Sequence, residues 1–215
     1  VAIWKRYYDT MQLKSPGTYC ILEHFAENTE EIELSDYGMM LWGNSNYNFS
    51  EASMGWVPTS NFEWYLHTAR GWSKPHVVGY MESHDEERLM YKNLTFGNSS
   101  GTYNVRTEAT ALRRMEAAAS LFLTIPGPKM IWEFGERGYD VPLTFGGSNV
   151  ANKPPRWEYM LVPERVHLYN TYKSIIQLRL SNPAVFNNTS FTYDFNIGLV
   201  KGFQIADPNA AGKKV

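Results

Sequence analysis

Cysteine is almost absent from this 215-residue chain, which has one, Cys20. A single cysteine excludes an internal disulfide, and its place in an apolar run favours a small buried thiol. Long hydrophobic runs are also missing. The longest, Ala117–Ile125, falls well short of the roughly 20 residues that a membrane-spanning helix requires, and no charged-then-apolar leader opens the chain. We therefore expect neither disulfides nor a membrane span.

Neither sign of charge dominates. Lys and Arg number 20 against 22 Asp and Glu, a formal net charge of −2, and the basic residues are scattered rather than gathered in stripes. A nucleic acid is therefore not an expected partner. No His, Cys and Asp cluster has the spacing of metal ligands, so no metal site is expected in this segment. Aromatic residues are plentiful at 15%, enough for a core and for platforms against sugar rings.

Two acidic residues stand at the ends of buried-looking runs. Glu23 closes the run that begins at Tyr19, Asp85 closes the run that begins at Val77, and each is followed by a polar loop. Strand ends are where α/β barrels place their chemistry. Two carboxyl groups near one point can divide acid, base and electrostatic roles, so carbohydrate cleavage is the first reaction to consider. Taken alone, such residues are more often helix caps or surface charges.

The hydrophobic pattern alternates between strand and helix. The expected strands cover 18–25, 38–43, 77–85 and 129–135, the expected helices cover 2–13, part of 50–71, 105–124 and 163–181, and the expected loops include 44–49 and 97–101. This order implies parallel strands joined by helical crossovers, with the helix at 163–181 facing a sheet. Four strands do not close a barrel, which uses eight. We therefore expect an α/β fold in which residues 1–184 form the second half of a (β/α)8 barrel and residues 185–215 begin an all-β domain.

Four separated segments support this fold and point to one family. They are LeuGluHisPhe (22–25), the stretch 36–48, TyrMetGluSerHisAsp (80–85) and the stretch 123–140. In this order they resemble segments of the α-amylase family, glycoside hydrolase family 13, and 36–48 is similar to its bacterial branch. Residues 172–179 are similar to the helix that closes the barrel. The resemblance covers nearly the whole chain and implies the C-terminal half of the catalytic barrel plus the start of the C-terminal β domain.

The resemblance assigns roles to individual residues. It makes Glu23 the general acid/base, Asp85 the carboxylate that stabilises the oxocarbenium-like transition state, and His84 a hydrogen-bonding partner of the sugar in the cleaved subsite. The implied reaction is retaining hydrolysis of the α-1,4 bonds of starch-like glucans. The family's nucleophile is an aspartate within a Gly-x-Arg-x-Asp pattern, which nothing in this chain matches. We expect it upstream of Val1, in the N-terminal half of the barrel, and expect this fragment alone to be inactive.

For the other polar and aromatic residues we expect roles in packing or in sugar binding rather than in catalysis. Trp42, at the end of an expected strand, is the predicted platform for a sugar ring, whereas Trp56, Trp64 and Trp72 are expected to pack in the core or against helices. Glu82 and Asp85 are three positions apart, an odd spacing, so in a strand their side chains would point to opposite faces. We expect it to be structural or paired with an Arg.

Several alternatives stay open at this stage. The chain could belong to a non-catalytic glucan-binding or scaffold relative, although retention of Glu23 with the His84–Asp85 pair argues against this, and within the enzymes transglycosylation is a close variant. A half barrel also has two unpaired strand edges that invite a swapped assembly. Calcium is expected only in the full-length protein, and no other cofactor is expected. The size of the substrate predicts a secreted, periplasmic or cell-surface protein.

Overall fold

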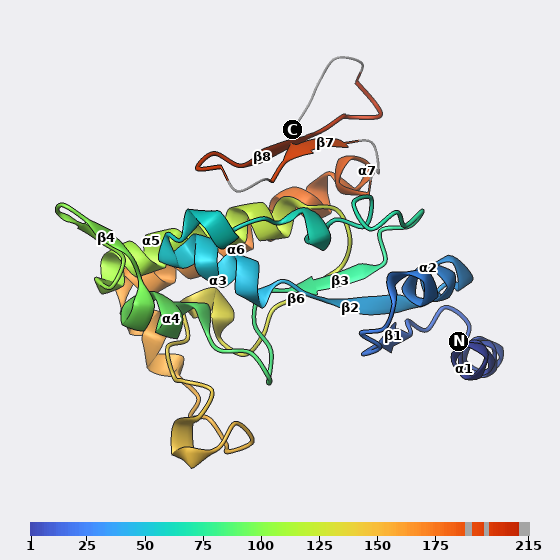
Figure 1. Cartoon of the computed structure of the whole chain (residues 1–215), viewed down its shortest axis with the longest axis horizontal. Coiled ribbons are helices and arrows are strands. Elements are labelled where there is room, and N and C mark those ends of the chain that lie inside the picture. Colours follow the sequence, from blue (N-terminus) through green and yellow to red (C-terminus); the bar gives the residue numbers. More distant parts are fainter. Residues whose placement is uncertain (188–190, 196–197, 211–215) are drawn as a thin grey trace.

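The computed structural model describes residues 1–187, 191–195 and 198–210. Its centre is a parallel sheet with strand order β1–β2–β3–β6 (Figure 1). The strands of this sheet are β1 (Ile21–Leu22), β2 (Met40–Asn44), β3 (Val77–Tyr80) and β6 (Lys129–Met130). Each expected strand is therefore present, and all pairs are parallel as the alternating pattern predicted.

Helices connect the strands and cover the sheet (Figure 1). They are α1 (Ala2–Lys14), α2 (Asn28–Tyr37), α3 (Asn46–Met54), α4 (Leu89–Phe96), α5 (Glu108–Thr124), α6 (Pro163–Ser181) and α7 (Pro183–Phe186). Short 3-10 turns are η1 (Val57–Thr59), η2 (Glu63–Tyr65), η3 (Gly135–Arg137), η4 (Phe145–Gly147) and η5 (Trp157–Leu161). The expected loop at 97–101 is instead part of a small antiparallel pair, β4 (Ser99–Ser100) with β5 (Tyr103–Asn104).

The strands are shorter than the sequence predicts. β1 stops at Leu22 and β3 at Tyr80, although the apolar runs continue. The backbone turns after β3, where the carbonyl of Tyr80 accepts hydrogen bonds from the N–H (3.1 Å) and the hydroxyl (2.5 Å) of Ser45. Glu23 and Asp85 therefore lie in the loops that follow these strands, not on the strands themselves.

The prediction of a loop at 44–49 is wrong, because α3 begins at Asn46. The Asn-rich sequence is helical here since its polar side chains have tertiary partners. The Asn46 amide donates hydrogen bonds to the carbonyls of Met81 (2.7 Å) and Glu87 (2.9 Å), beyond the end of β3. Phe49 buries its ring in the core on the other side. Turn-forming residues were thus overridden by contacts that local sequence does not reveal.

The helix predicted within 50–71 is also shorter than expected. α3 ends at Met54, because Gly55 adopts a left-handed conformation with φ of 91° that favours glycine and stops a helix. Only the short turns η1 and η2 follow before β3.

The main core lies among helices α3, α4, α5 and α6 and the turn η2. α6 packs along α5 rather than on the sheet as predicted, and it buries Leu168 and Tyr172. The largest of the residues that fill this core are Phe49, Phe62, Tyr65, Met81, Leu89, Met90, Met115, Phe122, Tyr172 and Phe195. Cys20 is buried in a second cluster below α1 and α2, and burial raises the pKa of its thiol. The expected small buried thiol is confirmed.

Antiparallel strands β7 (Phe191–Asp194) and β8 (Gly202–Ile205) form a hairpin above the helices (Figure 1). Phe195 belongs to the main core, and its carbonyl accepts a hydrogen bond from the N–H of Phe62 (3.2 Å). The start of an all-β domain at 185 stays a prediction, and its residues 188–190, 196–197 and 211–215 lie outside the described part of the chain. Among the described helices, none is both long and apolar enough to cross a membrane.

We expect Gly79→Ala to destabilise the protein by about 1–3 kcal/mol, because it overpacks the sheet. A Cβ at Gly79 in β3 would lie 1.8 Å from Cε2 of Tyr65, whose ring is buried and stacked on Phe122. Urea unfolding measures the change. Gly202→Ala in β8 is the matched control, since a Cβ there meets no atom within 4 Å. Equal unfolding midpoints for the two variants would contradict this account.

Candidate active site

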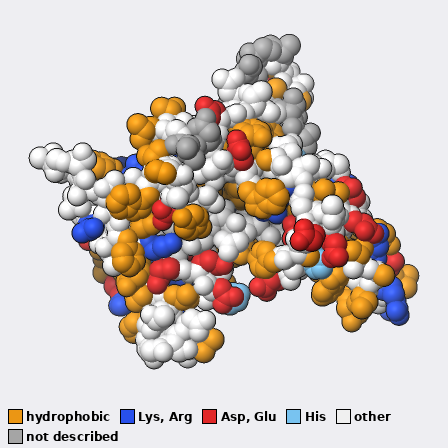
Figure 2. Space-filling model, viewed as in Figure 1, with side chains coloured by type: hydrophobic (Ala, Val, Ile, Leu, Met, Phe, Trp, Pro, Cys, Tyr) orange, Lys and Arg blue, Asp and Glu red, His pale blue; other side chains and the backbone are white. Residues whose placement is uncertain are grey.

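The sequence-predicted site residues lie at one edge of the sheet. Glu23 directly follows β1, Asn44 ends β2, the pair His84–Asp85 follows β3, and Trp132 follows β6. Because the four strands are parallel, their carboxyl ends share this edge. Acidic side chains gather around an indentation at the lower centre of the face in Figure 2. The fold thus brings together residues that are more than 100 positions apart in the sequence.

Tyr80 marks the centre of this edge. Burial raises the pKa of its hydroxyl, and the nearby carboxylates of Glu86, Glu23 and Asp85 raise it further. All three carboxylates therefore lie within electrostatic reach of one phenol. β1 and β3 both pair with β2, so Glu23 and Asp85 follow the two strands that flank β2.

Glu86 and Ser83 hold the loop that follows β3. The Asn44 amide donates a hydrogen bond to Oε1 of Glu86 (2.5 Å), and the Ser83 hydroxyl donates to Oε2. Ser83 Oγ also accepts the backbone N–H of Asp85 (3.1 Å). The position of Asp85 is thus fixed through its backbone, and its carboxylate is left exposed.

The side chains of His84 and Asp85 are both exposed. Nε2 of His84 lies 3.4 Å from Oδ2 of Asp85, an ion pair that solvent weakens and that contributes little to stability. The imidazole is tilted against the indole of Trp132, with ring centroids 5.9 Å apart. Both polar side chains are therefore available to a ligand.

Arg88 lies beneath this loop and was not singled out by the sequence. It is 1% exposed, its Nη1 donates a hydrogen bond to the carbonyl of Ser83 (2.6 Å), and its Nη2 lies 3.8 Å from Oε2 of Glu133. The guanidinium also faces the rings of Trp132 and Tyr139, at 6.0 Å and 5.6 Å. An Arg between a polar loop and an apolar helix gives no sequence signal of burial, so only the packing reveals its role.

Glu82 has a structural contact, but not for the reason given by strand alternation, since β3 has already ended. Its Oε1 accepts the backbone N–H of Leu89 (2.7 Å) at the start of α4. Its Oε2 lies so close to Gly135 that a Cβ there would be 2.4 Å away. Burial raises the pKa of Glu82 to about 7, and the Leu89 N–H and the Arg88 charge partly oppose this.

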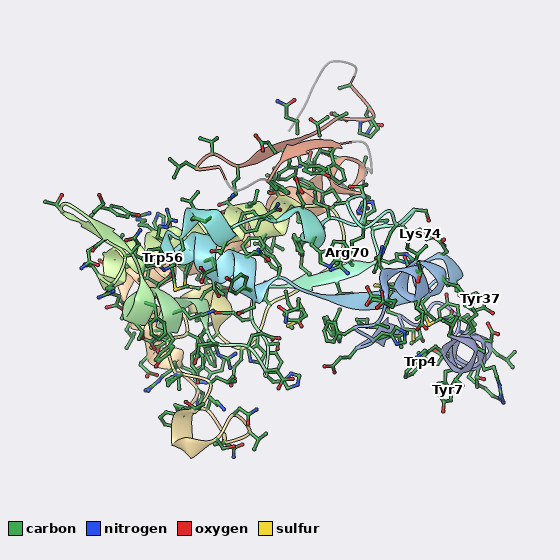
Figure 3. The ribbon with its side chains drawn as sticks, viewed as in Figure 1. Trp4, Tyr7, Tyr37, Trp56, Arg70 and Lys74 are labelled. Atoms are coloured by element: carbon green, nitrogen blue, oxygen red, sulfur yellow. The ribbon has the colours of Figure 1, made fainter. Side chains whose placement is uncertain are left out.

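Trp42 is half-buried in β2, and its indole lies edge-on to Tyr80, with centroids 5.8 Å apart. It therefore lies near the carboxylates, and its predicted contact with a sugar stays a prediction. Among the other tryptophans, Trp72 is buried as expected, at 3% exposure. Trp56 and Trp64 are exposed instead. Figure 3 shows Trp56 well apart from Arg70, which lies beside the sheet with its guanidinium 5.0 Å from the centroid of the Trp64 ring.

Metal ligands are not gathered at this edge. Within the residues that the structure describes, no group of three or more His, Cys, Asp and Glu side chains could hold a metal ion. The expectation of calcium in the full-length protein stays a prediction.

Solved structures share this fold. The α-amylase from H. orenii matches with a TM-score of 0.59 at 16% identity, over 95% of this chain and 44% of that chain. A glycogen-degrading pneumococcal virulence factor matches with a TM-score of 0.68 at 14% identity, over 97% and 29%. A cyclomaltodextrinase matches with a TM-score of 0.64 at 16% identity, over 95% and 32%.

These likenesses concern the fold. The chain spans less than half the length of each of these three neighbours, and the four-stranded parallel sheet is consistent with a partial barrel. No protein-family model and no curated protein sequence matches the chain. The chemistry therefore has to be argued from the residues at the edge of the sheet.

Proposed function

We propose that this chain forms the C-terminal barrel half of an α-amylase-type retaining glycoside hydrolase that cleaves α-1,4 bonds in starch-like glucans. The observation that carries the proposal is that Glu23 and Asp85 follow β1 and β3, the two parallel neighbours of β2, at the carboxyl edge of the sheet. The fold is one that an α-amylase, a glycogen-degrading factor and a cyclomaltodextrinase also have. Their names favour an α-linked glucan as the substrate class.

The proposed reaction has two steps. In the first, Glu23 gives its proton to the glycosidic oxygen as the bond from that oxygen to the anomeric carbon breaks, and a carboxylate nucleophile forms a covalent bond to the same carbon. In the second, the Glu23 carboxylate takes a proton from water, whose oxygen displaces the nucleophile. Under this proposal the nucleophile comes from the N-terminal half of the barrel.

The remaining residues bind the sugar and stabilise charge. The Asp85 carboxyl group faces the positive charge that develops on the sugar in the transition state. His84 donates a hydrogen bond to a sugar hydroxyl, and Trp42 offers its ring edge beside Tyr80. The proposed substrate is a polymer, for which we propose a secreted, periplasmic or cell-surface location.

Asp85→Asn tests this proposal in the protein that carries the chain at its full coding length. We expect the wild type to release short maltooligosaccharides from amylose, and the variant to release them about 100- to 1,000-fold more slowly, because transition-state charge stabilisation is lost. Chromatography of the products gives the rate and separates hydrolysis from transglycosylation, which would lengthen or branch the glucan.

Asp194→Asn, a change of the same kind at an exposed position in β7, is the control and should keep the wild-type rate. The second candidate is a glucan-binding scaffold, which would bind amylose without cleaving it. A full-length protein that binds amylose but releases no sugar would replace the hydrolase proposal with the scaffold.

A further inference from the structure

Trp157 is the most exposed tryptophan among the described residues, at 67%. It opens η5, on the segment 131–161 that follows β6 and projects at the bottom of Figure 1. An indole of this size normally buries much of its surface.

The indole is exposed but held in place. Phe134 packs edge-on to it, with centroids 5.0 Å apart and planes at 74°. The guanidinium of Arg137 lies 5.0 Å from the centroid of the same ring, and also faces Phe134 (5.3 Å) and Tyr169 (5.5 Å). Three rings thus surround the Arg137 guanidinium, and this cation–π contact holds the indole in place. A ring that is already fixed loses little conformational entropy when a ligand stacks on it.

A continuous set of contacts connects this indole to the candidate active site. Phe134 stacks on buried Tyr139, with centroids 5.7 Å apart. Arg88 faces Tyr139 on one side and Trp132 on the other, and Trp132 contacts His84. The position of Trp157 relative to the His84–Asp85 loop is therefore set by packed groups rather than by a free loop.

Polar side chains flank the exposed indole. Nη1 of Arg156 lies 3.2 Å from Oε1 of Glu158, and both side chains are accessible to solvent. A planar guanidinium and a carboxylate together offer donors and acceptors at fixed positions. An exposed apolar ring whose two neighbours in the sequence form such a pair matches a sugar, which has an apolar face and hydroxyl groups around its rim.

We propose that Trp157, with Arg156 and Glu158, is a second contact site for the same α-glucan chain that enters the indentation. A pyranose ring stacks on the indole, and its hydroxyl groups bond to the flanking pair, at a distance from the cleaved bond. This inference rests on the proposed function, because it takes an α-glucan as the ligand. It predicts a preference for long chains over short oligosaccharides.

Trp157→Ala in the full-length protein tests the site by native electrophoresis through gels that contain amylopectin. We expect the apparent dissociation constant for amylopectin to rise about tenfold, while the affinity for maltose, which is too short to reach both sites, stays at the wild-type value. Trp157→Phe keeps a ring and should recover part of the loss. Trp64→Ala is the matched control, because Trp64 is also exposed, at 56%, and also lies 5.0 Å from a guanidinium, that of Arg70.

The outcomes separate the two proposals. Suppose that amylopectin retains Trp42→Ala less than the wild type but retains Trp157→Ala equally well. This result would overturn the second contact site and leave the proposed function intact. A wild type that amylopectin does not retain would overturn both. An equal loss in Trp157→Ala and Trp64→Ala would also overturn the site, and thermal unfolding of each variant shows whether the fold survives the substitution.

Discussion

Glu23→Gln lowers the turnover of an α-1,4 glucan by about 100- to 10,000-fold in the full-length protein and leaves glucan binding near the wild-type level. The amide keeps the shape of the side chain but can neither give a proton to the leaving oxygen nor take one from water. Glu23 directly follows β1 and is exposed at the edge where Asp85 also lies. Steady-state kinetics with amylose, together with amylopectin affinity electrophoresis, measure the two quantities separately.

Glu27→Gln provides the comparison for this result. Glu27 is an exposed carboxylate four residues further along the same loop, and its side chain makes no capping hydrogen bond to α2. We expect the turnover of the Glu27→Gln variant to equal that of the wild type. If Glu23→Gln retains full turnover, Glu23 has no acid/base role; if it loses binding as well as turnover, its role is in substrate affinity.

Glu82 makes the stability of the protein fall as the pH rises from about 4.5 to about 7. Burial raises the pKa of this carboxyl from 4.5 to about 7, so the folded state holds the proton over a pH range in which the unfolded chain has released it. The stabilisation from Glu82 is fully present below the lower value and is lost as the pH passes the higher one. The difference in pKa corresponds to about 3 kcal/mol in the free energy of unfolding.

Urea unfolding at pH 4.5 and pH 8, on the wild type and on Glu82→Gln, isolates this contribution. The amide stays neutral and keeps an acceptor for the Leu89 N–H, so the variant lacks this pH dependence, while all other groups titrate alike in both proteins. Arg88, Glu87 and Glu136 are the charges that act on Glu82, and each is present in both. Parallel stability curves for the two proteins would show that Glu82 is ionised in the folded state near its ordinary pKa.

The order of strands and helices could be predicted because it depends on local patterns. The apolar runs predicted β1, β2, β3 and β6, and a stretch rich in helix-forming residues predicted α5. The ends of these elements could not be predicted, since they depend on distant partners. β3 stops where Ser45 bonds to Tyr80, and α3 forms where Asn46 reaches the backbone beyond β3; neither partner is near in sequence.

The candidate site divides in the same way. Glu23, His84 and Asp85 could be brought to one edge from the sequence, because they follow parallel strands. Their neighbours Glu86 and Arg88 could not, since a polar loop does not show which of its charges are held by other strands. The catalytic and binding roles of the predicted residues stay predictions until the substitutions above are measured.

Arg88 connects two parts of the protein that appear separate in the sequence. Its planar guanidinium donates a hydrogen bond to the carbonyl of Ser83 and faces two rings of the segment after β6. The compact ammonium of a lysine does not reproduce this geometry. Among relatives, position 88 and positions 132 and 139 are therefore expected to covary. Recombination that exchanged one of these segments without the other would leave a buried positive charge without its partners, so we expect only joint exchange of the two segments to preserve the fold.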